Sequence, residues 1–116
     1  MTSYQLKQLS KIKRLVYSGK RKFLKRKDRD YILDLLDLGI DEESAWKEIM
    51  NLSKADYWYD DRSAYIFEKD KALVFKKSIN GNKAYIKVKL DINKDDEMTV
   101  CISFHKDIKR GDNNAL

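Results

Sequence analysis

The chain of 116 residues contains one histidine, His105, at the end of its last predicted strand. A histidine titrates near neutral pH and can give or take a proton, and a carboxylate such as Glu68 can act as a base. Lys87 could stabilise charge on a phosphate, and Tyr85 could hydrogen-bond a phosphate or stack on an unpaired base. Such a set could cut RNA without a metal: a base takes the 2′-hydroxyl proton, an acid protonates the departing 5′-oxygen, and cations hold the phosphate.

Each of these residue types also has a simpler explanation. A histidine at a strand end is often an ordinary surface residue, and tyrosines and lysines commonly solvate the exposed face of an antiparallel sheet. The aromatic run from Tyr57 to Tyr59 is typical of a core corner as well as of a platform on which bases stack. Residue types alone therefore leave a non-catalytic basic domain as an open alternative.

The elements that would position these groups are four stretches with a two-residue period, which predict strands. They cover Arg62–Glu68, Ala72–Ile79, Ala84–Leu90 and Met98–Phe104. Asn80-Gly81 predicts a two-residue type I′ turn, because both residues tolerate the positive φ that this turn needs. With that turn, Lys76 should pair with Tyr85.

The alternation in the last strand predicts one apolar face in the core, made of Met98, Val100, Ile102 and Phe104. The other residues would face the open side of the sheet: Thr99, Cys101, Ser103 and His105. In the neighbouring strand the open side would carry Tyr85, Lys87 and Lys89. A three-residue turn over 69–71 would add Glu68 to this side, whereas a two-residue turn would reverse it.

The first half of the chain has helical periodicity. Apolar residues recur at helical spacing from Leu6 to Val16, and Gly19 can end that helix. A second helix is predicted over roughly 28–38, and a third after Asp41 as its N-cap. Residues 20–24 are interpreted as a short extended connection. Residues 53–61, with Ser53 at a cap position, are interpreted as a helical turn that leads into a loop.

Helices followed by antiparallel strands predict an α+β fold, in which the helices cover the apolar side of a mainly antiparallel sheet. We expect a single domain over residues 1–116. Residues 1–52 would be mainly helical, 62–105 would form the antiparallel sheet, and 106–116 would be a flexible tail.

The charge of the chain is unevenly placed. Residues 1–27 hold ten of the 25 basic side chains and none of the 19 acidic ones. Such a block attracts phosphate-rich or acidic partners through a salt-sensitive field, although a solvated helix surface would carry the same charge. The block therefore favours nucleic acid or an acidic protein as a partner without saying which.

Other features narrow the class of protein. Cys101 has no second cysteine for a disulfide and no neighbouring ligand at zinc spacing, so we expect it to fill space and expect no metal and no cofactor. No apolar run approaches the roughly 20 residues that span a bilayer, and the N-terminus lacks a signal-peptide core. We expect a cytoplasmic protein without a membrane partner.

Four segments in order along the chain resemble the MqsR-type toxins of bacterial type II toxin–antitoxin systems, within the RelE-like group of messenger-RNA interferases. These segments are Leu9–Val16, Leu52–Tyr57, Tyr85–Val88 and Ile102–His105. The resemblance implies a RelE-like toxin fold and a metal-independent endoribonuclease that degrades messenger RNA and arrests growth. It also implies a cognate antitoxin that holds the enzyme inactive.

The resemblance places the family's catalytic tyrosine on Tyr85 and its basic last-strand residue on His105. Two positions depart from the family: Glu68 stands where it has a glutamine, and Tyr59 where it has a lysine. The best-known branch has lysine at the position of His105. A histidine there can be neutral at pH 7 and serve as base or acid, so the family's preference for GC-containing triplets need not extend to this chain.

The resulting hypothesis is an RNA-cleaving toxin in which His105 and Glu68 share the proton transfers, while Tyr85 and Lys87 hold the phosphate. RNA binding is assigned to the basic N-terminal block and to Lys76, Lys89, Tyr59 and Arg62. The expected partners are single-stranded messenger RNA and an antitoxin protein. The alternatives are a non-catalytic nucleic-acid-binding module, a repressor of a partner enzyme, and an adaptor whose basic helix docks an acidic protein.

Overall fold

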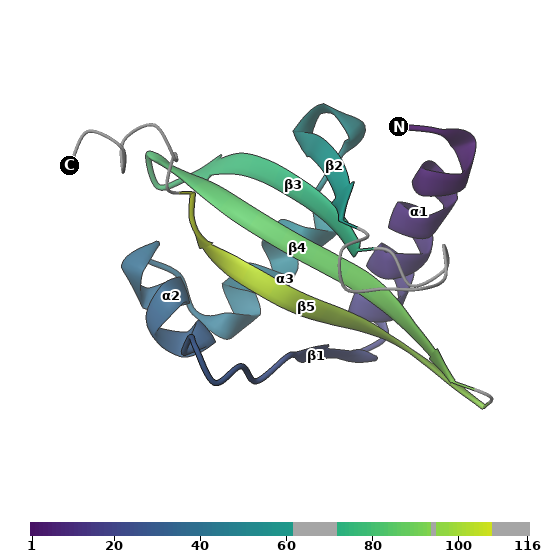
Figure 1. The fold of residues 1–116 in the computed structure, drawn as a ribbon, viewed down its shortest axis with the longest axis horizontal. Helices are drawn as coiled ribbons and strands as arrows, with labels where there is room; N and C mark the ends of the chain where they lie inside the picture. Colours follow the sequence, from purple (N-terminus) through teal and green to yellow (C-terminus); the bar gives the residue numbers. More distant parts are fainter. Residues whose placement is uncertain (62–71, 94, 108–116) are drawn as a thin grey trace.

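The computed structural model describes residues 1–61, 72–93 and 95–107, which form an α+β fold (Figure 1). Within these ranges there are three α-helices, one short 3-10 helix and one five-stranded sheet. In chain order the elements are α1 (Ser3–Tyr17), β1 (Arg21–Phe23), α2 (Tyr31–Asp37), α3 (Glu42–Met50), η1 (Lys54–Asp56), β2 (Tyr57–Asp61), β3 (Ala72–Ile79), β4 (Asn82–Asn93) and β5 (Asp96–Lys106). None of the helices in these ranges has the length and apolar character needed to cross a bilayer.

The helices begin at side chains that satisfy their free N–H groups. Thr2 and Gln5 form a capping box at the start of α1. Asp41 caps α3, as the sequence predicts, and Asp30 caps α2. The second helix therefore begins at Tyr31, later than the predicted residue 28, and residues 24–30 form a loop between β1 and α2.

The sheet has the strand order β1-β5-β4-β3-β2. Its β3–β4 hairpin turns at Asn80 and Gly81, whose φ angles are 51° and 81°, as a type I′ turn requires. Lys76 pairs with Tyr85, so the predicted register is confirmed. This register decides which side chains of β3 and β4 share a face.

Two strands of the sheet were not predicted. Residues 20–24 were interpreted as a connection, but β1 pairs in parallel with β5, with Arg21 opposite Thr99. Residues 53–61 are predicted to be a helical turn that leads into a loop. The turn is confirmed, because Ser53 caps η1. The loop is wrong, because residues 57–61 form β2, which pairs antiparallel with β3 and has an irregularity around Trp58. The predicted strand Arg62–Glu68 and the turn over 69–71 lie outside the described residues.

A β-bulge in β5 reverses the side of the sheet on which the side chains of half the strand lie. Lys87 of β4 pairs with Ser103, but the next residue, Val88, pairs with Cys101. Ile102 is therefore an extra residue on β5, and the strand upstream of it presents its side chains with the opposite alternation.

Upstream of this bulge, the prediction of which β5 side chains lie in the core and which lie on the open side is wrong. Thr99 and Cys101 are buried against the helices rather than exposed on the open side. Val100 and Ile102 do not join the main core but form a separate small cluster with Ala72. Downstream of the bulge the prediction holds, because Phe104 is in the core and His105 lies on the other face.

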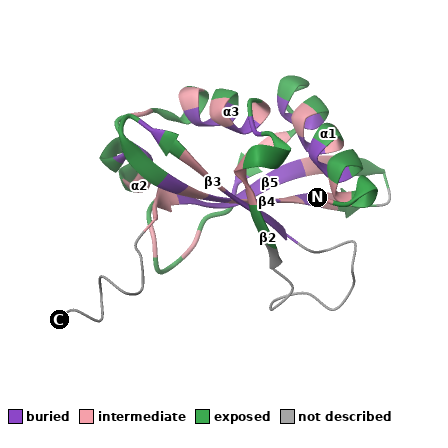
Figure 2. Ribbon diagram, turned by 90° about the horizontal axis from the view of Figure 1, so that it is seen from above, coloured by how far each residue is buried: buried purple, intermediate pink, exposed green. Residues whose placement is uncertain are grey.

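The main core lies between the helices and one face of the sheet, and Figure 2 shows α1 and α3 together on that side. Phe23 of β1 packs between Tyr31 and Trp46, with ring centroids 4.5 Å and 4.6 Å away. Thr99 donates its hydroxyl hydrogen to the Ile12 carbonyl of α1 at 3.0 Å. The helices thus cover one side of the sheet, as predicted, and leave the other side to the polar residues of β4 and β5.

The end of β5 runs further than predicted. Lys106 belongs to the strand, and the backbone N–H of Asp107 donates to the Lys83 carbonyl at 2.8 Å. Lys106 is thus part of the sheet, and Asp107 is hydrogen-bonded to it, whereas both were predicted to belong to a flexible tail over 106–116. Residues 108–116 lie outside the described residues.

The bulge places Cys101 on the core side of the sheet, and this position predicts how fast its thiol reacts. The side chain is fully buried under the helices, and burial raises the pKa of the thiol, so little reactive thiolate forms. The native protein should therefore react with a thiol reagent such as DTNB about a thousandfold more slowly than the unfolded chain. The measurement is the rate of thiol labelling with and without denaturant. Fast labelling of the native protein would mean that Cys101 faces the open side and that the bulge is absent.

Candidate functional site

The open face of the sheet brings Tyr85 and His105 together. They are direct partners across β4 and β5, and their rings are nearly parallel, at 14°, with centroids 5.1 Å apart. Lys87 and Ser103 form another pair on the same face, two residues after Tyr85 on β4 and two residues before His105 on β5. Sequence reasoning predicted this group of side chains, and the register confirms that they lie side by side.

The surroundings of His105 favour the neutral form of its ring. Its Nδ1 lies 2.8 Å from the Lys106 carbonyl oxygen, which can only accept, so Nδ1 carries the hydrogen and Nε2 of the neutral ring keeps its lone pair. Burial lowers the pKa of His105 below its ordinary value, and the charges of Arg29 and Arg26 act in the same direction. These effects outweigh the Lys106 carbonyl and Asp34, which raise the pKa.

Aromatic side chains of β2 extend the face beyond Tyr85. The hydroxyl of Tyr59 lies 3.3 Å from that of Tyr85. Trp58 is 59% exposed, and Lys76 Nζ lies 4.1 Å from the centroid of its ring. Tyr57, in contrast, packs into the core against Phe75. Tyr57 is thus the predicted core corner, and the next two rings are exposed. That bases stack on these rings stays a prediction.

The lysines assigned to RNA binding differ in their surroundings. Lys87 and Lys89 are partly exposed and follow one another along the open face of β4. Lys76 lies on the same face, and its Nζ is 3.0 Å from the Asp107 carboxylate, so part of its charge is compensated. Glu68 and Arg62, the other two predicted site residues, lie outside the described residues.

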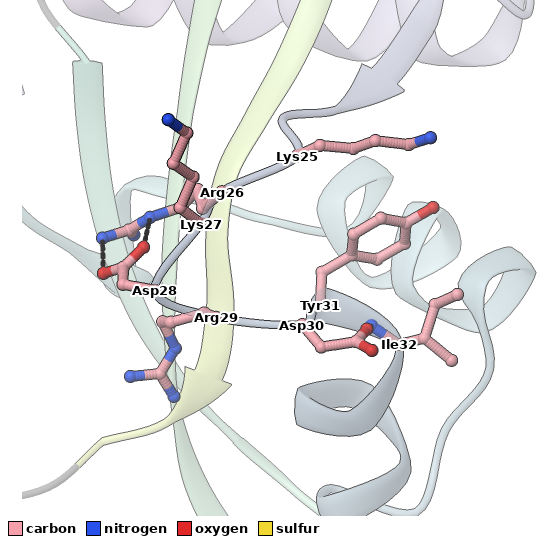
Figure 3. A pocket seen from close by; sticks show the side chains of 8 residues that line it. All are labelled: Lys25, Arg26, Lys27, Asp28, Arg29, Asp30, Tyr31 and Ile32. Atoms are coloured by element: carbon pink, nitrogen blue, oxygen red, sulfur yellow. Dashed lines mark hydrogen bonds and ion pairs between the residues drawn. The ribbon is translucent and has the colours of Figure 1, made fainter.

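Arg26 reaches this face from the loop between β1 and α2, which sequence reasoning missed. Its Nη1 donates to Ser103 Oγ at 2.8 Å, while Nε and Nη2 donate to the two carboxylate oxygens of Asp28 at 3.0 Å and 2.7 Å. Residues 25–30 of the loop and the first two residues of α2, Tyr31 and Ile32, line a pocket of about 570 Å³. Figure 3 shows Arg26 and Asp28 meeting on one side of the β5 ribbon, whereas Lys25 points to the other. In the sequence Arg26 is only one of the ten basic residues of the N-terminal block, and nothing there distinguishes it from the others.

The basic N-terminal block is divided between the two sides of the molecule. α1 packs on the helical side of the sheet, where Lys11 pairs with Glu97 at 2.6 Å and Arg21 pairs with Glu43 at 3.0 Å. The basic residues of α1 therefore lie on the side opposite Tyr85. That the block guides RNA stays a prediction, and Arg26 is a member of the block that contacts the open face.

Within the described ranges, no three His, Cys, Asp or Glu side chains gather in a way that could hold a metal ion. Comparison of the chain with protein-family models, with curated proteins and with solved structures finds no match. The resemblance to MqsR-type toxins therefore stays a prediction, and the functional argument rests on the geometry of the open face.

The lowered pKa of His105 predicts a pH dependence of stability. The unfolded histidine takes up its proton near pH 6.5, whereas the folded one does so only at lower pH, so the unfolded state binds more protons between these two values. The contribution of His105 to the free energy of unfolding is therefore complete above pH 6.5 and is lost as the pH falls towards the folded pKa.

Urea unfolding of the wild type and of His105→Gln at pH 7 and pH 5 measures this contribution. The variant should lose less stability on acidification, because its amide does not titrate. An equal loss in the two proteins would show that His105 is not held neutral by its surroundings.

Proposed function

We propose that this chain is a metal-independent endoribonuclease that cuts single-stranded RNA on the open face of its sheet. The observation that carries the proposal is the neutral His105, with Nδ1 bonded to a carbonyl and its ring stacked on Tyr85. This arrangement leaves Nε2 as the proton acceptor, and the lowered pKa favours the unprotonated ring that a general base needs.

The reaction follows from the groups on the face. Nε2 of His105 takes the proton of a 2′-hydroxyl, and the 2′-oxygen attacks the neighbouring phosphorus. The bond from phosphorus to the 5′-oxygen breaks, and the hydroxyl of Tyr85, which lies 3.3 Å from that of Tyr59, supplies the proton to the leaving oxygen. Lys87 stabilises the charge on the phosphate. Glu68, predicted to share the proton transfers, keeps this role only as a prediction.

The aromatic rings of β2 support RNA as the substrate. Trp58 and Tyr59 are 59% and 41% exposed beside the site. Unpaired bases stack on such rings, and this is how proteins commonly grip single-stranded RNA. A double helix keeps its bases stacked on one another, so the face favours a single strand.

The resemblance to MqsR-type toxins extends the proposal to the cell. In this extension the substrate is messenger RNA in the cytoplasm, cleavage arrests growth, and a cognate antitoxin restrains the enzyme. Expression of the chain without its antitoxin is then toxic because of the same side chains that cut RNA.

The second candidate function is a module that binds RNA without cutting it. The same exposed rings and lysines favour it, since stacking and cations suffice for binding. The two functions differ in the fate of the RNA: the module binds with a strong dependence on salt and leaves its ligand intact.

The proposal predicts that His105→Gln and Tyr85→Phe both lower RNA cleavage by about 10²-fold to 10⁴-fold, the range typical of a lost general acid or base. Tyr85→Phe keeps the ring that stacks on His105, so its effect isolates the hydroxyl. The measurement is single-turnover cleavage of a single-stranded RNA in EDTA, with growth arrest on expression as the cellular counterpart.

Lys47→Gln serves as the matched control, because Lys47 is an exposed residue of α3 on the helical side. It should cleave like the wild type. Undiminished cleavage and toxicity of His105→Gln would remove His105 from the site, and intact RNA with every protein would favour the binding module.

A further inference from the structure

Arg26 has the geometry of a phosphate-binding side chain. Its Nε and Nη2 form a fork that donates two charge-assisted bonds to the Asp28 carboxylate, at 3.0 Å and 2.7 Å. The planar guanidinium fork fits a phosphate in the same bidentate way as a carboxylate. Asp28 therefore occupies the position that a phosphate would take.

The fork is fixed over the proposed site by its third contact. Nη1 donates to the hydroxyl of Ser103, which is only 8% exposed. Ser103 and His105 are two residues apart on the same face of β5, which is about 7 Å along a strand. RNA that is cut at His105 extends within reach of Arg26.

The contact between Arg26 and Asp28 is easily exchanged. Asp28 is 63% exposed, and an ion pair in contact with water contributes little to stability. Arg29, in the same loop, is different, because its partner Asp34 belongs to α2 and is only 21% exposed. Of these two forks, that of Arg26 is the one an incoming anion can take over.

We propose that Arg26 binds the RNA phosphate next to the one that is cleaved, and that Asp28 occupies its fork in the free protein and yields when RNA binds. This inference rests on the proposed function. It adds Arg26 as a phosphate-binding residue and Asp28 as its competitor, neither of which RNA cleavage at His105 requires. Asp28 then lowers the affinity for RNA, while Ser103 holds Arg26 in position for the exchange.

The test measures binding of a fluorescein-labelled single-stranded RNA with 2′-O-methyl groups, which keeps every phosphate but lacks the attacking hydroxyl. Fluorescence anisotropy gives the affinity of the full chain over a range of salt concentrations. Two variants address the proposal, Asp28→Asn and Arg26→Gln. Two controls change charge equally on the helical side: Glu43→Gln, which removes the carboxylate that pairs with Arg21 Nη2, and Arg14→Gln on α1.

We expect Asp28→Asn to bind the probe about threefold more tightly than Glu43→Gln, because it alone removes the competitor of the phosphate. Arg26→Gln should bind about tenfold more weakly than Arg14→Gln, as expected for a lost charge-assisted contact. Its plot of log affinity against log salt should be shallower by about 0.7, the value for one phosphate contact on a single strand.

Equal affinities of Asp28→Asn and Glu43→Gln would overturn the competition, and equal affinities and salt slopes of Arg26→Gln and Arg14→Gln would overturn the phosphate contact.

A parallel assay with unmethylated RNA separates these failures from that of the proposed function. If this RNA is cut but the variants bind the methylated probe like their controls, the inference about Arg26 and Asp28 fails and the proposed function stands. If the variants bind the probe as expected but no RNA is cut, the proposed function fails and the phosphate contact stands. Absence of binding by the wild type overturns both.

Discussion

The extra residue in β5, Ile102, determines what each side of the sheet presents. Upstream of it, Thr99 and Cys101 turn towards the helices, and the Thr99 hydroxyl is satisfied by a carbonyl of α1. Downstream of it, Phe104 enters the core and His105 faces away. Because side chains alternate with a period of two, a single unpaired residue is enough to reverse the facing between these halves.

The bulge also limits the polar site to one end of the open face. Val100 and Ile102 form an apolar cluster with Ala72, while Tyr85 and His105 lie towards the β3–β4 turn. This end of β5 is also where the loop between β1 and α2 delivers its charges. Burial of the ring keeps His105 neutral, and the nearby Arg26 and Arg29 oppose a second positive charge there. The fold thus places a histidine with a lowered pKa beside arginine side chains.

Much of the fold could be predicted because the relevant signals are local. Asn80 and Gly81 determine a turn, the turn determines the register, and the register places Lys76 and Tyr85 opposite each other. The cap at Asp41 likewise acts within one helical turn. Such features depend on a few neighbouring residues, so the sequence is sufficient to find them.

The features that could not be predicted depend on distant pairing. The alternation from Met98 to His105 is unbroken in the sequence, and Ile102 becomes an extra residue only when β5 is paired with β4. The three residues of β1 are too few to show a period, and their partner lies at the other end of the chain. Arg26 acquires its position from the path of a loop. Tertiary contacts decide all three.

The chemistry assigned to the open face leaves a mark on the RNA that reports the mechanism directly. If a 2′-oxygen activated by His105 attacks the phosphorus, the products carry a 2′,3′-cyclic phosphate on one fragment and a 5′-hydroxyl on the other. Mass spectrometry of the fragments made by the purified wild-type protein in EDTA measures these ends. The account predicts cyclic phosphate and 5′-hydroxyl ends, and fragments with 5′-phosphate and 3′-hydroxyl ends, or uncut RNA, would contradict it.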